Sequence, residues 1–121
     1  MFSPDNNSPI YLQIAEKIKS DIVSGELSPG ARLPSVRDLA LKLKVNPNTV
    51  QKALAELEMR GLLFTERTNG KFVTHDTGLI ISIKNDYAKN IAESFLSSME
   101  KLGFSNDEAI NYLSNLGGEK N

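Results

Sequence analysis

The sequence reads Leu33-Pro34-Ser35-Val36-Arg37-Asp38-Leu39-Ala40 and, after four intervening residues, Val45-Asn46-Pro47-Asn48-Thr49-Val50. Apolar residues recur at helical spacing in both segments, so the pattern predicts two short helices joined by a tight turn. The second helix opens with small polar residues, a layout that suits insertion of a helix N-terminus into a DNA groove. The two segments therefore predict a helix-turn-helix.

The second helix has clear start and stop signals. Asn46 suits the N-cap, and Pro47 suits the first helical position, where no N–H is needed. Gly61 suits the C-cap end, so the helix is expected over residues 46–60. Its apolar face consists of Val50, Ala53, Leu54 and Leu57.

The polar side chains of this helix are candidates for reading DNA bases. Off the apolar face lie Asn48, Thr49, Gln51 and Lys52. Asn and Gln pair bidentately with adenine in the major groove, Thr contacts a thymine methyl group, and Lys holds a phosphate or a guanine. The free N–H groups at the helix N-terminus offer a further phosphate contact.

The first helix of the pair begins at a capping-box variant made by Ser35 and Asp38. Arg37 lies near the helix N-terminus, where a cation is unfavourable to the helix dipole. A residue that costs local stability is a functional candidate, and a solvated surface arginine is the alternative. An earlier helix is expected from Ser8-Pro9 to Gly25, with isoleucine at every fourth position from Ile10 to Ile22.

A β-hairpin is expected over residues 62–75. Residues 62–66 and 71–74 are rich in β-forming residues, and Asn69-Gly70 between them is a strong hairpin signal. Arg67, Asn69 and Lys71 then lie at or near the tip, and Gly70 permits close backbone approach. A hairpin after a helix-turn-helix is a wing that reaches the minor groove or flanking phosphates. The alternative is a plain surface hairpin with scattered cations.

Composition restricts the function classes. The 121 residues carry a net charge of −1, but residues 28–75 hold eight Lys and Arg against four Asp and Glu, so this segment has a charge of +4 and the rest −5. A local basic footprint is compatible with specific DNA binding. The chain has no Cys and a single His, His75, so we expect no metal site and no cofactor. No nucleophile with a neighbouring base is apparent, so we expect no enzyme.

The last third predicts a helical hairpin that self-associates. One apolar stripe runs along a long helix that Gly103 ends, and residues 105–108 form a full capping box for a second helix before Gly117-Gly118. Two helices cannot bury their own stripe, so self-association is the natural solution, and folding back onto the first domain is the alternative. The predicted dimerization residues are Ile80, Ile83, Tyr87, Ile91, Phe95, Met99, Leu102, Ile110, Leu113 and Leu116.

One element, Gly25-x-Leu27-x-Pro29-Gly30-x-x-Leu33-Pro34-Ser35-x-Arg37, is long and specific. With Pro9-Ile10-Tyr11 and the segments around residues 48–63 and 69–73, it resembles the N-terminal DNA-binding domain of GntR-family bacterial transcription regulators over residues ~8–76. The resemblance implies a winged helix that binds an operator as a dimer. It also implies DNA contacts by Arg37, by Gly70 of the wing, and by the polar residues Asn46, Asn48, Thr49 and Gln51. Some relatives carry a base-reading Arg where this chain has Pro47, so base preference is expected to shift toward adenine.

The short C-terminal region resembles the YtrA subfamily, in which such a region serves dimerization and whose members commonly repress transport-related operons. We therefore expect a mainly α fold: a winged helix-turn-helix domain over residues 1–76 and a two-helix dimerization region over residues 77–121. The candidate DNA contacts are Arg32, Ser35, Arg37, Asn46, Asn48, Thr49, Gln51, Lys52, Arg67, Asn69, Gly70 and Lys71.

The expected function is a homodimeric repressor that binds an inverted-repeat operator in double-stranded DNA. A small-molecule effector, if one exists, would bind at the dimer interface, and no residue identifies it. No apolar run of eighteen residues and no signal peptide is present, so a cytoplasmic protein with no membrane partner is expected. The alternative is a winged-helix module that binds a partner protein without specific DNA binding.

Overall fold

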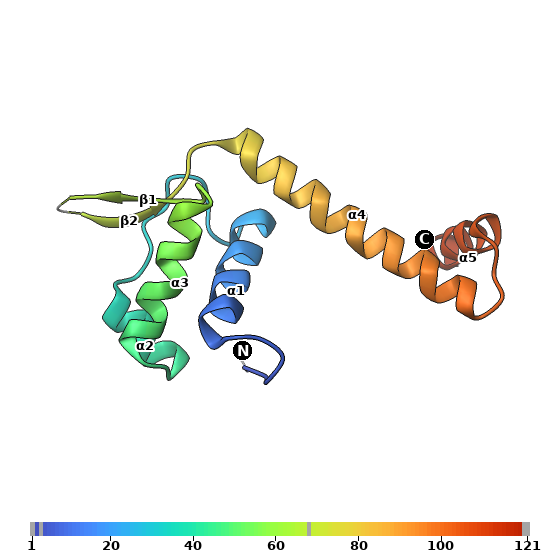
Figure 1. The fold of residues 1–121 in the computed structure, drawn as a ribbon. Helices are drawn as coiled ribbons and strands as arrows, with labels where there is room; N and C mark the ends of the chain where they lie inside the picture. The colour runs from blue at the N-terminus through green and yellow to red at the C-terminus, as the bar shows by residue number, and fades with distance from the viewer. Residues whose placement is uncertain (1, 3, 68, 120–121) are drawn as a thin grey trace. The chain divides into compact units, whose positions relative to one another are not determined.

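The computed structural model describes residues 2, 4–67 and 69–119. Within these residues the chain forms three helices, a two-stranded antiparallel hairpin and two further helices (Figure 1). The contacts divide the chain into two compact units, residues 1–84 and residues 85–121. The expected mainly α fold with a small hairpin is confirmed.

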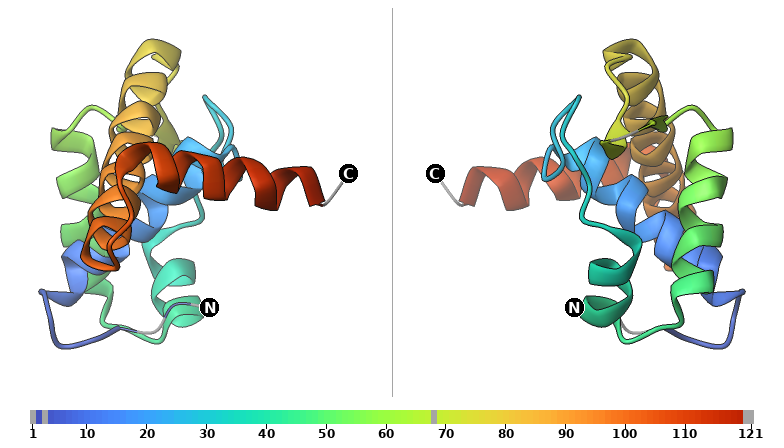
Figure 2. Two further views of the ribbon diagram at one scale, coloured as in Figure 1. Left: turned by 90° about the vertical axis from the view of Figure 1, so that its right-hand side faces the viewer. Right: turned by 90° about the vertical axis from the view of Figure 1, so that its left-hand side faces the viewer.

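The first unit is built on three helices: α1 (Ile10–Ser24), α2 (Val36–Leu43) and α3 (Pro47–Met59). Helix α1 lies beside α3, as Figures 1 and 2 show, and α2 also packs on α3. The isoleucine stripe of α1 and the apolar face of α3 supply most of the shared core. Its fully buried large side chains are Ile14, Ile22, Val50, Leu54, Leu57, Leu62 and Val73.

Capping hydrogen bonds define where the helix pair begins and turns. The backbone N–H of Asp38 donates to Ser35 Oγ (3.0 Å) at the start of α2. The N–H of Asn48 donates to Asn46 Oδ1 (2.8 Å) at the start of α3, as the sequence predicted. Between them Lys44 adopts a left-handed conformation, with φ of 59°, and makes the turn. At α1 the sequence predicted Ser8 as the N-cap and Pro9 as the first helical residue, but Pro9 is the N-cap and no side chain caps this helix.

The hairpin consists of β1 (Leu63–Glu66) and β2 (Gly70–Val73). Its register pairs Glu66 with Gly70, so Gly70, which the sequence placed in the connection over residues 67–70, is the first residue of β2. Gly70 has a φ of 94°, a conformation that glycine adopts without strain. Thr68, within the expected turn, lies outside the described residues.

Residues 30–33 run beside β2 and fix the base of the hairpin. The N–H of Gly30 donates to the Val73 carbonyl (2.9 Å), and the N–H of Leu33 donates to the Lys71 carbonyl (2.9 Å). Arg32 faces Phe72 in an antiparallel bridge. These bonds tie the segment before α2 to the second strand of the wing.

Helix α4 (Thr77–Lys101) starts within the first unit, where the N–H of Leu79 donates to Asp76 Oδ1 (3.0 Å). Ile80 is only 9% exposed in the core of this unit, and Ile83 packs against the same core. Ile80 therefore fills the core of the first unit and Ile83 contributes to it, while their role in dimerization stays a prediction.

Helix α5 (Asn106–Glu119) begins at the predicted capping box. The N–H of Ser105 donates to Glu108 Oε1 (2.9 Å), and the N–H of Glu108 donates to Ser105 Oγ (3.2 Å). The backbone N–H and the hydroxyl group of Ser105 both hydrogen-bond the Glu108 carboxylate, which favours its charged form and lowers the pKa of this group. The helix continues through residues 117 and 118, where the sequence suggested its end, because glycine weakens a helix without terminating it.

None of the helices within the described residues is long and apolar enough to cross a membrane.

Replacing Leu57 with alanine tests the α1–α3 core. Leu57 is fully buried, so the cavity left by Leu57→Ala should lower the free energy of unfolding by about 3 kcal/mol. Leu41→Ala is the matched control, because this leucine is 70% exposed on α2, and its effect should stay within about 0.5 kcal/mol. Urea unfolding at a fixed protein concentration measures both, and equal losses would contradict the packing described.

Candidate nucleic-acid interface

The N-terminal half of α3 presents polar side chains to solvent. Asn48, Gln51 and Lys52 are exposed and Thr49 is half-buried, because the buried positions of the helix turn these four away from the core. Asn46 has a structural role as well, since its side-chain oxygen Oδ1 accepts the capping hydrogen bond. The NH₂ group of the same side chain stays available for another contact. The helix-turn-helix therefore offers amide and hydroxyl groups at one helix end.

Tyr11 of α1 contributes to this surface, although it was not among the predicted DNA contacts. Lys52 Nζ lies 4.3 Å from the centroid of the Tyr11 ring, a cation–π contact that holds the ammonium group beside the start of α3. A shallow hollow of ≈ 340 Å³ lies here and is lined by Ile10, Tyr11, Asn48, Thr49 and Lys52. The aromatic side chain thus positions a cation next to two candidate base-reading residues.

Helix α2 adds Ser35 and Arg37 at its first turn. Ser35 is occupied as the N-cap, while its hydroxyl hydrogen remains free to donate. Arg37 is exposed, and no ion pair involves it within the described part of the chain. An unpaired guanidinium at this place is suited to a phosphate or a guanine.

The wing brings a second group of candidates together. A Cβ placed on Gly70 would lie 3.6 Å from Arg32 Nε, so the guanidinium of Arg32 rests over the glycine. Arg67 and Asn69 are exposed in the loop, where Asn69 Nδ2 donates to Glu66 (3.3 Å). Two cations therefore lie at or beside the tip, on different chain segments.

Lys71 differs from the other wing candidates because its ammonium group is already engaged. Its Nζ donates to Glu58 Oε1 and to Thr65 Oγ1, each at 2.8 Å, and its side chain is 25% exposed. The hydrogen bonds from Lys71 and Thr65 hold the pKa of the Glu58 carboxyl group below its usual value. Lys71 lies on β2 directly after Gly70, close to the tip, and its ammonium group faces α3.

The model of the gntR family of bacterial regulatory proteins matches residues 10–73, which include both groups of candidates. The chain belongs to the GntR family. YhcF of Bacillus subtilis, an uncharacterized HTH-type transcriptional regulator, is 38% identical over 105 residues that cover 87% of each chain. The transcriptional repressor YtrA of the same organism is 35% identical over 103 residues, covering 80% of this chain and 79% of that protein.

Solved structures agree with the family assignment. A GntR-family regulator from Listeria monocytogenes superposes with a TM-score of 0.81 at 43% identity, covering 93% of this chain and 98% of that chain. The DNA-binding domain of AraR in complex with operator ORX1 gives a TM-score of 0.55 at 30% identity, covering 61% of this chain and 93% of that one. This GntR-family chain is thus a winged-helix, DNA-binding transcription regulator and not an enzyme.

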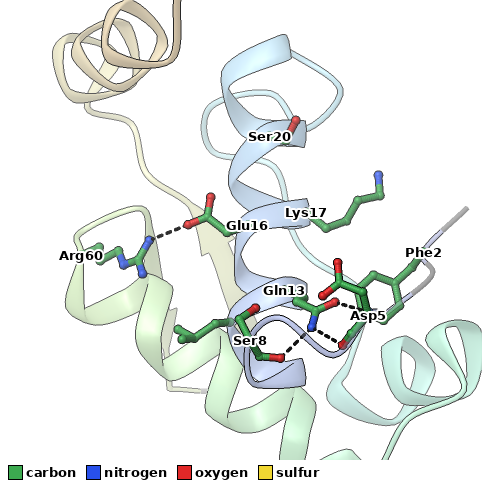
Figure 3. A pocket seen from close by; sticks show the side chains of 9 residues that line it. Phe2, Asp5, Ser8, Gln13, Glu16, Lys17, Ser20 and Arg60 are labelled. Atoms are coloured by element: carbon green, nitrogen blue, oxygen red, sulfur yellow. Dashed lines mark hydrogen bonds and ion pairs between the residues drawn. The ribbon is translucent and has the colours of Figure 1, made fainter. Parts of the chain in front are cut away.

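A separate hollow of ≈ 660 Å³ lies along α1, away from the DNA-contact candidates (Figure 3). Gln13 closes one end, where its amide group donates to the carbonyls of Asp5 (2.9 Å) and Ser8 (2.7 Å). At the other side Arg60 pairs with Glu56 (2.8 Å) and Glu16 (3.5 Å), which raises the Arg60 pKa above its ordinary value. None of the twelve candidate contacts lines this hollow.

His75 is exposed at the end of the wing, and its ring contacts two other residues. It packs over Gly30, which has no side chain to obstruct it, and lies 5.6 Å from the Phe64 ring centroid. No group of three or more potential metal-ligating side chains occurs within residues 2, 4–67 and 69–119.

The lowered pKa of Glu58 predicts a pH-dependent stability. A carboxyl group whose pKa is lower in the folded state stabilises the fold above its unfolded pKa, about 4.3, and the stabilisation is lost as pH falls through the folded value. Glu58→Gln should therefore destabilise the protein slightly near neutral pH and have no effect in acid. Thermal unfolding of both proteins between about pH 7 and pH 3 measures the difference. In a Lys71→Met background the pH-dependent difference should shrink, and its persistence would contradict the assignment to Lys71.

Proposed function

We propose that this GntR-family chain is a repressor that binds an inverted-repeat operator as a homodimer, with α3 and its caps (residues 46–60) in the major groove and the wing (residues 62–75) beside it. The observation that carries the proposal is the exposed row of amide and cationic side chains at the start of α3, on a helix whose opposite face is buried. Similarity to an operator-bound domain and to proteins named as repressors supports it.

Asn48 and Gln51 are the proposed base readers. Both side chains are exposed, and each carries an amide that pairs bidentately with adenine. Thr49 is suited to a thymine methyl group and Asn46 to a base edge or phosphate. Because Pro47 has no side-chain donor, we propose a half-site richer in A·T pairs than one read by an arginine at this position.

Phosphate contacts are proposed for the cations around these readers. Arg37 and Ser35 lie at the first turn of α2, Lys52 is held by Tyr11, and Arg32 and Arg67 flank Gly70 in the wing. Asn69 adds a neutral donor at the tip. These contacts would set register and affinity, while the amides of α3 would set sequence.

The proposed dimer uses the apolar surface of α4 and α5. Within the described residues Ile91 is 69% exposed and Leu102 73% exposed, and Ile110, Leu113 and Leu116 are also exposed. Tyr87, Phe95 and Met99 continue the stripe on α4 as half-buried side chains. Because such a stripe is costly to leave in water, we propose that a second copy covers it and that residues 77–121 form the dimerization region.

Repression of a transport-related operon is the biological role that we propose, by analogy with the YtrA subfamily. Any small-molecule effector would then act at the interface between copies.

Selection of bound duplexes from a random pool, with purified protein at physiological salt, tests the operator proposal. The expected result is an inverted repeat with a fixed half-site spacing of about one helical turn. On the selected operator, Gln51→Ala or Asn48→Ala should reduce discrimination by about 1–3 kcal/mol at one base pair of each half-site. Arg67→Ala should weaken all sequences alike and reduce the salt slope by about 1.

Asn90→Ala on α4 is a suitable control, because Asn90 is an exposed amide outside the winged helix. If no sequence is enriched and the immobilised protein retains a partner protein on a column, the alternative of a protein-interaction module is favoured.

Charged substitutions on the C-terminal stripe test the dimer. Leu113→Asp and Ile91→Asp place a carboxylate on the proposed interface, so each should shift the protein from dimer to monomer in sedimentation velocity. Leu41→Asp is the matched control, because it introduces the same charge at an exposed leucine on α2. A wild-type chain that sediments as a monomer at micromolar concentration would disprove the proposal.

A further inference from the structure

Three side chains from three different elements form a closed ring of hydrogen bonds, which we call the Glu58 triangle. Thr65 of β1 donates its hydroxyl hydrogen to Glu58 Oε1 (2.8 Å), and Lys71 of β2 donates to the same oxygen (2.8 Å). Lys71 also donates to Thr65 Oγ1 (2.8 Å). Glu58 belongs to the last turn of α3, so the triangle connects the helix to both strands of the wing.

The strand register explains why these groups meet. Thr65 and Lys71 are cross-strand partners, and so are Leu63 and Val73 two positions away. Because side chains alternate along a strand, all four lie on one face of the hairpin. Leu63 and Val73 are buried in the core, so the same face brings Thr65 and Lys71 to α3. Phe64 and Phe72 stack on the opposite face, with ring centroids 5.6 Å apart.

We propose that Glu58 is a positioning residue for DNA binding, because its hydrogen bonds with Thr65 and Lys71 hold the wing in a fixed position beside α3. We call these hydrogen bonds the brace. Lys71 acts as part of the brace and not as a phosphate contact. The inference rests on the proposed operator binding and assigns roles within that site. A two-stranded hairpin of four-residue strands has little stability of its own and needs such support.

The position of the triangle makes the brace effective. Thr65 lies two residues before Arg67, and Lys71 follows Gly70 directly, so the bonds are formed close to the tip. Among the described residues near the tip, the N–H of Leu33 also donates to the Lys71 carbonyl (2.9 Å), and the guanidinium of Arg32 lies over Gly70. Two of the three ammonium hydrogens of Lys71 are used inside the triangle. A phosphate contact by Lys71 would have to compete with a carboxylate at 2.8 Å.

The two roles of Lys71 predict opposite effects of removing Glu58. If Lys71 bound phosphate, Glu58→Ala would free the lysine and remove a negative charge from the DNA side, so affinity for DNA would rise. If Glu58 braces the wing, the same substitution lets the wing move and affinity falls, although the protein has become more positive. The sign of the change therefore separates the two roles.

The experiment measures the affinity of full-length variants for the selected operator at one salt concentration. Glu58→Ala is expected to weaken binding by about three- to tenfold, the range for partly exposed, charge-assisted hydrogen bonds. Lys71→Met should have a similar effect, and the double variant should be no weaker than either single variant. Glu58→Gln should recover most of the affinity, since an amide oxygen accepts from both partners.

Glu56→Ala is the matched control, because it removes one carboxylate from the same helix, where Glu56 pairs with Arg60 and not with the wing. It should leave affinity unchanged or slightly raised. An equal or greater affinity of Glu58→Ala relative to wild type would overturn the proposal, as would additive losses in the double variant.

Amide hydrogen exchange of the free protein provides a readout that needs no DNA. Glu58→Ala should increase exchange at the hairpin amides of residues 63–73 by about three- to tenfold, whereas Glu56→Ala should not. Unchanged hairpin exchange would overturn the brace even if operator binding is intact. Failure of the wild-type protein to bind any duplex, with the exchange effect present, would instead refute the proposed operator binding and leave the brace established.

Discussion

The structure depends on the burial of one face of α3. Val50, Ala53, Leu54 and Leu57 are buried against α1 and α2, and this burial sets the rotation of the helix about its own axis. With a period of 3.6 residues, fixing these positions turns Asn48, Gln51 and Lys52 outward. Burial thus determines which side chains face a ligand, and the Asn46 cap determines where the helix begins.

The wing depends on the same helix by a different means. Its backbone is anchored by residues 30–33 at the base, and its side chains are anchored by Glu58 from the last turn of α3. Apolar burial holds Leu63 and Val73, but it ends where the hairpin leaves the core. Toward the tip, the side-chain contacts with α3 are made by charged and hydroxyl groups, so the orientation of the wing there is sensitive to single substitutions.

Local sequence signals predicted the helices and their caps well, since capping depends on residues three or four apart. Asn46 and the box of Ser105 and Glu108 behave as expected for this reason. Tertiary partners were harder to predict. The contact of Lys71 with Glu58 had no local signal because the two residues are far apart in sequence. The burial of Ile80 had none either, because Ile80 shares the period of the stripe that follows it. The Lys52–Tyr11 contact joins α1 to α3 and has no local signature.

Ion pairs inside the winged helix reduce the number of cations that one protein chain can offer to DNA, and so affect how many chains are needed for tight binding. Residues 28–75 carry a charge of +4, but Lys71 and Arg60 are committed to carboxylates within the fold. Among the described residues, the cations left without an ion pair around the proposed interface are Arg32, Arg37, Lys52 and Arg67. Each phosphate contact contributes about 0.9 to the salt slope, so a few contacts give one copy only modest affinity at physiological salt. A second copy on an inverted repeat would double the contacts by supplying the same cations again, and the exposed stripe of α4 and α5 provides the surface that would join the copies.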